Sequence, residues 1–151
     1  MKYLLMCLIS ANTFAFVPAI EAVKIYNKII TVNNIKNAPT LIISVDDEIN
    51  GYYSKKDKAV ILNTGLLQEL DENGIAMTIG HELTHAKYKH VNYLLQSSKS
   101  SQAQEYLADK EGKILVEKAG YDMCEGMKWM PKQGDWDHPD LKHRKRALKC
   151  K

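Results

Sequence analysis

The sequence predicts an α+β fold in which a small antiparallel sheet packs on one long helix, with a second long helix beside it. Short runs rich in β-branched residues lie between residues 40 and 63 and predict the strands. Two segments with helical spacing of apolar residues follow, between residues 74 and 119. The chain of 151 residues contains no repeat and no linker long enough to divide it, which predicts a single domain.

The composition is that of an ordinary folded protein. Hydrophobic residues make up 45% of the chain and charged residues 26%, which excludes a disordered tail, a collagen-like chain and a protein with many membrane spans. Lys and Arg number 21 against 18 Asp and Glu, for a net charge of +3. This excess is too small to indicate a nucleic-acid partner, and we expect none.

The N-terminus has the pattern of a secretory signal peptide over residues 1–15. A basic residue near the start is followed by an uncharged segment from Tyr3 to Ile20. Small residues favour cleavage after Ala15, with Ala19 as the second choice, and a retained N-terminal membrane anchor is the alternative. We therefore expect a mature domain of residues 16–151 that has no membrane span and is exported to the periplasm or the extracellular space.

The first half of the domain predicts a helix and three strands. Apolar residues near helical spacing predict a helix over Glu21–Ile35. Strands are predicted at Thr40–Val45, Tyr52–Ser54 and Lys58–Asn63, because these β-branched and aromatic runs are separated by turn residues. A short helix over Leu66–Leu70 follows the last strand.

The second half predicts helices joined by polar or irregular segments. An apolar stripe predicts a helix over Gly74–His90, with Asp71 or Asn73 as its cap. The serine-rich Ser97–Ser101 is expected to be a connector before a helix over Gln102–Ala119. From residue 121 the chain is expected to be irregular until a basic helix begins near Leu141.

A candidate metal site lies in the first of these long helices. Residues 81–85 read His-Glu-Leu-Thr-His, an HExxH motif. His81 and His85 are four residues apart and therefore share a face, so that both imidazoles can bind one zinc ion per chain. Glu82 is turned by about 100° from His81, which suits a base that takes a proton from a reacting water molecule. The short motif also occurs by chance, so a third ligand is needed.

The third ligand is expected from the following helix. Glu105 and Asp109 are again four residues apart, and Glu105 comes twenty residues after His85, which is enough chain for the second helix to return antiparallel to the first. Glu105 would complete the metal site, and Asp109 would accept a hydrogen bond from a ligand imidazole. An ExxxD pattern alone is usually a solvated acidic face, but after an HExxH motif it is specific.

With these motifs the sequence resembles the gluzincin zinc metallopeptidases, specifically the small soluble members of the HtpX-like and CAAX-prenyl-protease-type group. The resemblance covers about Asn50 to Leu148. It extends to Asn63–Leu67, to Ala119–Asp122, and to His138-Pro139 followed by Arg144. It implies an α+β gluzincin fold and zinc-dependent cleavage of polypeptides.

The resemblance also implies roles for further residues. The strand near Ala59–Asn63 would be an edge that pairs with extended substrate. His138 would either donate a hydrogen bond to the oxyanion, supported by Arg144, or occupy the open zinc position and keep the enzyme latent; we expect the donor role. Gly74 and Lys145 depart from the group's usual residues, which bears on substrate class, and no feature indicates prenylated substrates.

Two points stay open at this stage. Cys124 and Cys150 would be the cysteines of the mature chain, and they either form a disulfide or remain two free thiols. The expected function is a zinc endopeptidase acting on extracytoplasmic polypeptides. The alternative is a non-catalytic or latent zinc-stabilised binding module acting on envelope proteins. Glu82 favours the enzyme, because a purely structural zinc site needs no base.

Overall fold

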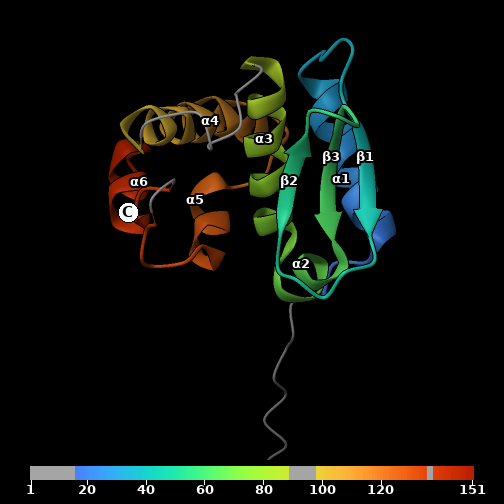
Figure 1. Ribbon diagram of the computed structural model, residues 1–151. Coiled ribbons are helices and arrows are strands. Elements are labelled where there is room, and N and C mark those ends of the chain that lie inside the picture. The colour runs from blue at the N-terminus through green and yellow to red at the C-terminus, as the bar shows by residue number, and fades with distance from the viewer. Residues whose placement is uncertain (1–15, 89–97, 136–137) are drawn as a thin grey trace, which may run out of the picture.

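The computed structural model describes residues 16–88, 98–135 and 138–151, and it confirms the α+β class (Figure 1). The predicted signal peptide lies outside these residues. The elements in chain order are α1 (Ala19–Val32), β1 (Thr40–Ser44), β2 (Gly51–Ser54), β3 (Ala59–Asn63), α2 (Thr64–Glu69), α3 (Glu72–Tyr88), α4 (Ser98–Lys118), α5 (Met123–Gly126), the 3-10 turn η2 (Met127–Trp129) and α6 (Leu141–Ala147).

The sheet is mixed, so the prediction of an antiparallel sheet was wrong. Its strand order is β1-β3-β2, with β1 parallel and β2 antiparallel to β3. The six residues 45–50 cross the end of β3, a distance of about 10 Å, and so place β2 on the far side. Every residue of β3 is buried, as expected for a central strand, whereas β1 and β2 alternate between partly buried and exposed positions. The expectation that Ala59–Asn63 is an edge is therefore also wrong, and β2 is an edge.

The hydrophobic core lies between the sheet and helices α1 and α3. Figure 1 shows α1 behind the sheet and α3 beside β2. Fully buried side chains come from all three layers, namely Ile25 and Ile29 of α1, Val60 and Leu62 of β3, and Ile75 and Ile79 of α3. The face of α3 that carries these isoleucines is fixed by the core, and the histidines of the same helix are thereby turned toward α4.

Helices α3 and α4 touch through their backbones at two glycines. A Cβ atom on Gly80 would lie 2.5 Å from Val116 Cγ2 and 3.0 Å from the carbonyl oxygen of Gly112. A Cβ atom on Gly112 would lie 3.0 Å from both the carbonyl carbon of Gly80 and the backbone nitrogen of His81. Only glycine allows this approach, which brings the acidic face of α4 within reach of the histidines.

The C-terminal part is more ordered than the sequence predicted. Helix α5 and turn η2 occupy a segment expected to be irregular, and α4 begins at Ser98, inside the expected connector. Serine is common at helix starts, which is why its run was misread as a loop. Cys124 and Cys150 form a disulfide with Cα atoms 5.4 Å apart, which ties the end of α6 to α5. Among the helices of the described residues, none is long and apolar enough to cross a membrane.

The contact between α3 and α4 gives a first prediction. Gly112→Ala places a methyl group 3.0 Å from two backbone atoms of α3 and forces the helices apart. Overpacking of this kind costs roughly 1–3 kcal/mol, of which the better helix propensity of alanine returns about 1. We expect a net loss of up to about 2 kcal/mol, centred near 1, in the free energy of unfolding, measured by urea denaturation. Lys110→Ala, at an exposed position of the same helix, is the control, and equal stability of both variants would contradict the contact.

Candidate metal centre and cleft

Helix α3 carries the HExxH motif on a regular, capped segment. The side chain of Asp71 accepts a hydrogen bond from the backbone N–H of Gly74 at 2.9 Å, so Asp71 is the cap that the sequence left open between two residues. The hydroxyl of Thr84 is fully buried and is satisfied by donating to the carbonyl oxygen of Gly80 at 3.0 Å. The motif residues therefore sit at fixed positions on a stable helix.

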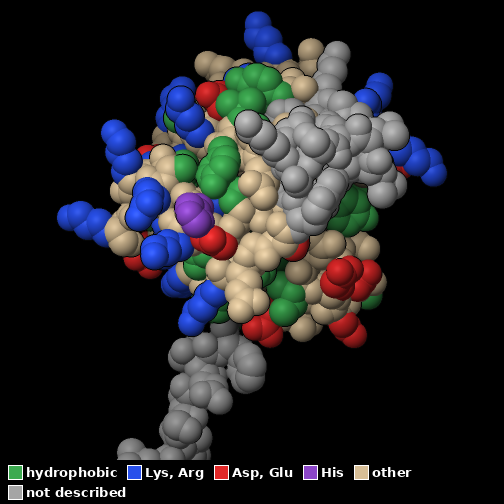
Figure 2. All heavy atoms as spheres, turned by 60° about the vertical axis from the view of Figure 1, so that its left-hand side comes forward, with side chains coloured by type: hydrophobic (Ala, Val, Ile, Leu, Met, Phe, Trp, Pro, Cys, Tyr) green, Lys and Arg blue, Asp and Glu red, His purple; other side chains and the backbone are tan. Residues whose placement is uncertain are grey.

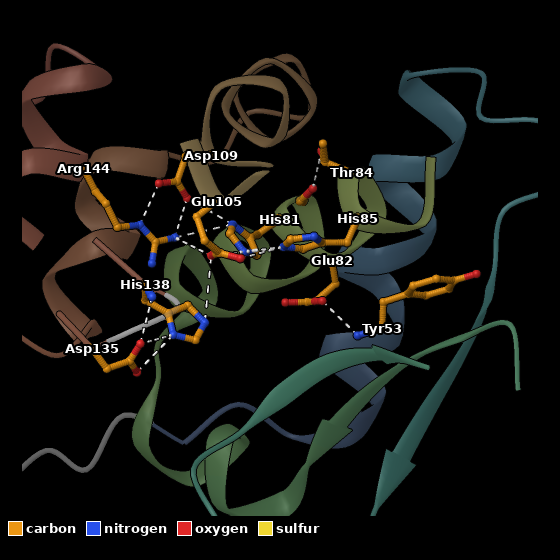
Figure 3. A network of polar contacts seen from close by, with 11 residues as sticks. Tyr53, His81, Glu82, Thr84, His85, Glu105, Asp109, Asp135, His138 and Arg144 are labelled. Atoms are coloured by element: carbon orange, nitrogen blue, oxygen red, sulfur yellow. Dashed lines mark hydrogen bonds and ion pairs between the residues drawn. The ribbon is translucent and has the colours of Figure 1, made fainter. Parts of the chain in front are cut away.

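The three predicted ligands converge on one point (Figure 3). Nε2 of His81 lies 2.9 Å from Nε2 of His85. The carboxylate of Glu105 reaches both rings, with Oε2 at 3.2 Å from His81 Nε2 and Oε1 at 3.3 Å from His85 Nε2. Ligands of a tetrahedral zinc ion, with bonds of 2.0–2.2 Å, lie about 3.3–3.5 Å from one another. Two imidazoles and one carboxylate can therefore hold a single metal ion, and three protein ligands leave one position open, as in catalytic zinc sites.

Asp109 orients the first histidine. Its Oδ1 lies 3.0 Å from Nδ1 of His81. Because a carboxylate only accepts hydrogen bonds, Nδ1 carries the proton and Nε2 is left to face the metal position. The sequence predicted this role for Asp109, and the geometry agrees with it.

Arg144 lies elsewhere than expected. Its Nε and Nη2 atoms donate to the two carboxylate oxygens of Asp109 at 2.6 and 2.5 Å, and Nη2 lies 3.9 Å from Oε2 of Glu105. The guanidinium is buried, with 4% of the residue exposed. Its two hydrogen bonds make it the partner of Asp109, whereas the resemblance implied support for His138.

The buried charges of this cluster balance one another. Burial opposes ionisation of both carboxylates, but His81 holds the pKa of Glu105 well below its usual range, and the hydrogen bonds from Arg144 lower the pKa of Asp109. Burial likewise opposes charge on His81, but the neighbouring Glu105 and Asp109 raise its pKa to about 10. Without a metal ion His81 therefore keeps a second proton, and its ring carries a positive charge. A bound divalent cation would take over the role of that proton, since ligand imidazoles must be neutral.

Glu82 lies outside the ligand group and faces the sheet. Its Oε2 accepts a hydrogen bond of 2.8 Å from the backbone N–H of Tyr53 in β2. Figure 3 shows the carboxylate on the side of the histidine pair that faces this strand. Burial raises the pKa of Glu82, which brings it closer to the neutral range that suits a general base.

His138 lies beside the ligand group, as the sequence predicted. Its Nε2 is 4.0 Å from Oε2 of Glu105, and 43% of its side chain is exposed. Asp135, which sequence reasoning missed, accepts hydrogen bonds from both the backbone N–H and Nδ1 of His138, at 2.8 and 2.9 Å. The only signal for this contact in the sequence is an acidic residue three positions before the histidine.

These groups open into a cleft of about 560 Å³. His81, Glu82, Glu105 and His138 line it together with an apolar wall. The wall residues come from α2, α3 and the segment after α5, and include Leu66, Leu70, Met77, Trp129 and Met130. Sequence reasoning did not place this wall, because its members are scattered along the chain. The cleft offers apolar contacts and the metal position to one extended ligand.

Comparison with known proteins identifies the family. The model of peptidase family M48 matches residues 21–99, just over half of the chain, and this segment includes the HExxH motif. No curated protein and no solved structure matches the chain. The other site residues, Glu105, Asp109, His138 and Arg144, lie beyond the matched segment, and the fold brings them to the motif. The chain belongs to peptidase family M48, whose members are zinc-dependent metallopeptidases.

Proposed function

We propose that the protein is a small exported zinc endopeptidase of the HtpX-like and CAAX-prenyl-protease-type group, which hydrolyses peptide bonds of extracytoplasmic polypeptides. The observation that carries this proposal is the position of Glu82. It stands next to a three-residue ligand group with an open position, but it is not part of that group. Such a base is needed for hydrolysis and has no use in a structural metal site.

Three residues beside the metal ligands have separate roles in the proposed hydrolysis. Bound zinc supplies Lewis-acid activation of water and of the substrate carbonyl. Glu82 takes the proton of the attacking water molecule and passes it to the leaving amine. Asp109 holds His81 in the tautomer that binds metal, and Arg144 keeps Asp109 ionised by two hydrogen bonds.

Strand β2 is the edge that supports binding of an extended substrate. The backbone N–H of Asn63 donates to the carbonyl oxygen of Asn50. In an antiparallel pair, hydrogen-bonded and non-hydrogen-bonded residues alternate along the strand. Asn50 is hydrogen-bonded to β3, so the backbone N–H and C=O groups of Gly51 and Tyr53 point away from it. The hydrogen bond from Tyr53 to Glu82 has the same direction. A peptide that adds a strand here would lie along the base and the metal position.

His138 supports either of two roles. Nδ1 donates to Asp135, so in the neutral imidazole Nε2 is an acceptor that faces Glu105 and can bind metal. That form favours a latent protein that acts mainly by binding, which is the alternative function. With a proton on Nε2 the same ring would instead donate to the oxyanion. We retain the donor role in the proposal, because Asp135 holds the ring beside the ligand group, where a donor would face the cleft.

Export is also part of the proposal, to the periplasm or the extracellular space. Val17 is buried, and its backbone N–H donates to the carbonyl oxygen of Leu67 at 2.8 Å. Cleavage after Ala15 keeps this contact, and cleavage after Ala19 removes it. We therefore expect the intact mass of the exported protein to match residues 16–151. A mass that starts at residue 20, or an uncleaved chain, would contradict this choice of site.

Measurements of zinc binding should distinguish the roles of Glu105 and Asp109. Glu105→Gln removes a ligand and should abolish stoichiometric zinc, whereas Asp109→Asn keeps the ligand group and should weaken zinc affinity roughly 10–100-fold. Metal analysis after dialysis and competition with a chelator measure both effects. Glu117→Gln, at an exposed position of the same helix, is the control. Full-affinity zinc in Glu105→Gln would show that another residue is the third ligand.

Glu82→Gln tests the enzymatic function itself. The amide cannot take a proton, so cleavage of an unfolded test protein should fall roughly 10²–10⁴-fold while the zinc content stays that of the wild type. Circular dichroism checks that the fold is retained. Equal cleavage by the zinc-loaded wild type and variant would refute the endopeptidase and leave the binding module.

His138→Ala distinguishes the roles of that histidine. If it donates to the oxyanion, kcat should fall roughly 10²–10³-fold with zinc retained. The control is His143→Ala, which removes an exposed histidine that pairs with Asp140. Faster cleavage by His138→Ala would establish the latent, metal-bound form, and an unchanged rate would show that His138 has neither role.

A further inference from the structure

A shallow pocket on the outer side of α6 is lined almost entirely by cations. It has a volume of about 730 Å³, and its basic residues are Lys132, Lys142, Lys145, Arg146, Lys149 and Lys151. Figure 2 shows several Lys and Arg side chains projecting from the left part of the face on which α6 lies. The small net charge of the whole chain therefore conceals a strong local excess.

The charges of this pocket are not neutralised within the described part of the chain. Among the described residues no Asp or Glu side chain lines the pocket, and none of its six basic side chains forms an ion pair with a described residue. Two described acids near in sequence are already engaged, since Asp140 pairs with His143 and Asp135 with His138. Six like charges held together without counter-charges repel one another, and an anionic partner would relieve that repulsion.

The kind of basic residue indicates the partner. Five of the six are lysines, whose compact ammonium groups bind phosphate as point charges and require no fixed bidentate geometry. Of the described residues that line the pocket none is aromatic, whereas proteins that bind single-stranded nucleic acid stack bases on aromatic rings. The rest of the lining is Leu141 and Cys150, whose disulfide and apolar surface suit the glycerol and acyl region beneath a lipid phosphate.

The pocket lies close to the cleft but on the other side of one chain segment. Lys132 lines the pocket, while its neighbours Pro131 and Gln133 line the cleft. On α6, Arg144 is buried toward the metal ligands, whereas Lys142 on the same helix and Lys149 just after it are exposed. An anionic surface bound at the pocket would thus leave the cleft uncovered.

We propose that this pocket binds the phosphate groups of anionic lipids and holds the protein peripherally on a bilayer surface. Clusters of four to eight basic residues next to a membrane bind anionic lipid in this way. Each basic residue changes the partition coefficient between water and membrane about five-fold. This inference does not depend on the proteolytic function, because none of the six residues contacts the candidate metal site.

The test is cosedimentation of the mature chain with vesicles of phosphatidylcholine containing 30% phosphatidylglycerol, at physiological salt. The variant Lys142→Gln/Lys145→Gln/Lys149→Gln should partition about 100-fold more weakly, with wild-type zinc content and thermal stability. The control Lys36→Gln/Lys55→Gln/Lys56→Gln removes the same net charge at exposed positions outside the pocket and should bind like the wild type. Binding of the wild type should also fall steeply at higher salt.

Four outcomes would overturn the proposal. These are equal binding to pure phosphatidylcholine, no binding to the anionic vesicles, equal loss in both triple variants, and release from the vesicles by millimolar inorganic phosphate at constant ionic strength. Duplex DNA and polyglutamate are offered in parallel. Tighter binding of either one than of the vesicles, lost in the pocket variant, would assign the pocket to that class of partner instead.

Discussion

The burial of two carboxylates on one turn of α4 is the constraint around which this protein is built. Glu105 and Asp109 are almost completely inaccessible to water, and an ionised carboxylate in such a place is stable only with cations and donors around it. The fold supplies these partners from two directions, imidazoles from α3 and a guanidinium from α6. A metal ion at the imidazoles would add a further positive charge beside the same carboxylates. The interactions that stabilise the fold here are therefore also those that favour metal binding.

This balance explains why the C-terminal segment belongs to the domain. Helix α6 has only seven residues and would not be stable alone. It is held by the buried pair between Arg144 and Asp109, by the capping hydrogen bond of Asp140, and by the disulfide at Cys150. Removing one partner of a buried ion pair leaves an uncompensated charge, which costs much more than the pair itself contributes. The segment is thus coupled to the metal site through charge, and covalently to α5.

The sequence predicted the parts of the site that depend on local spacing. His81 and His85, like Glu105 and Asp109, are separated by one helical turn, so their shared faces follow from helix geometry alone. Strand order does not follow in this way. The apolar run of β3 is compatible with an edge or a centre, and only the path of residues 45–50 makes it central. The contact of Arg144 with Asp109 did not follow from the sequence for a similar reason, because it joins residues 35 positions apart. The apolar wall of the cleft, scattered over α2, α3 and the segment after α5, has no sequence pattern at all.

The two glycines at the crossing of α3 and α4 also determine which parts of the molecule can move. Backbone atoms meet there directly, so no side-chain rotation can let the helices slide or separate. His81 follows Gly80 directly, and Glu105 lies two turns from Gly112, so the metal ligands on the two helices form one rigid unit. The width of the cleft therefore depends on its other walls, among them the β2 edge, while the spacing of the metal ligands stays constant.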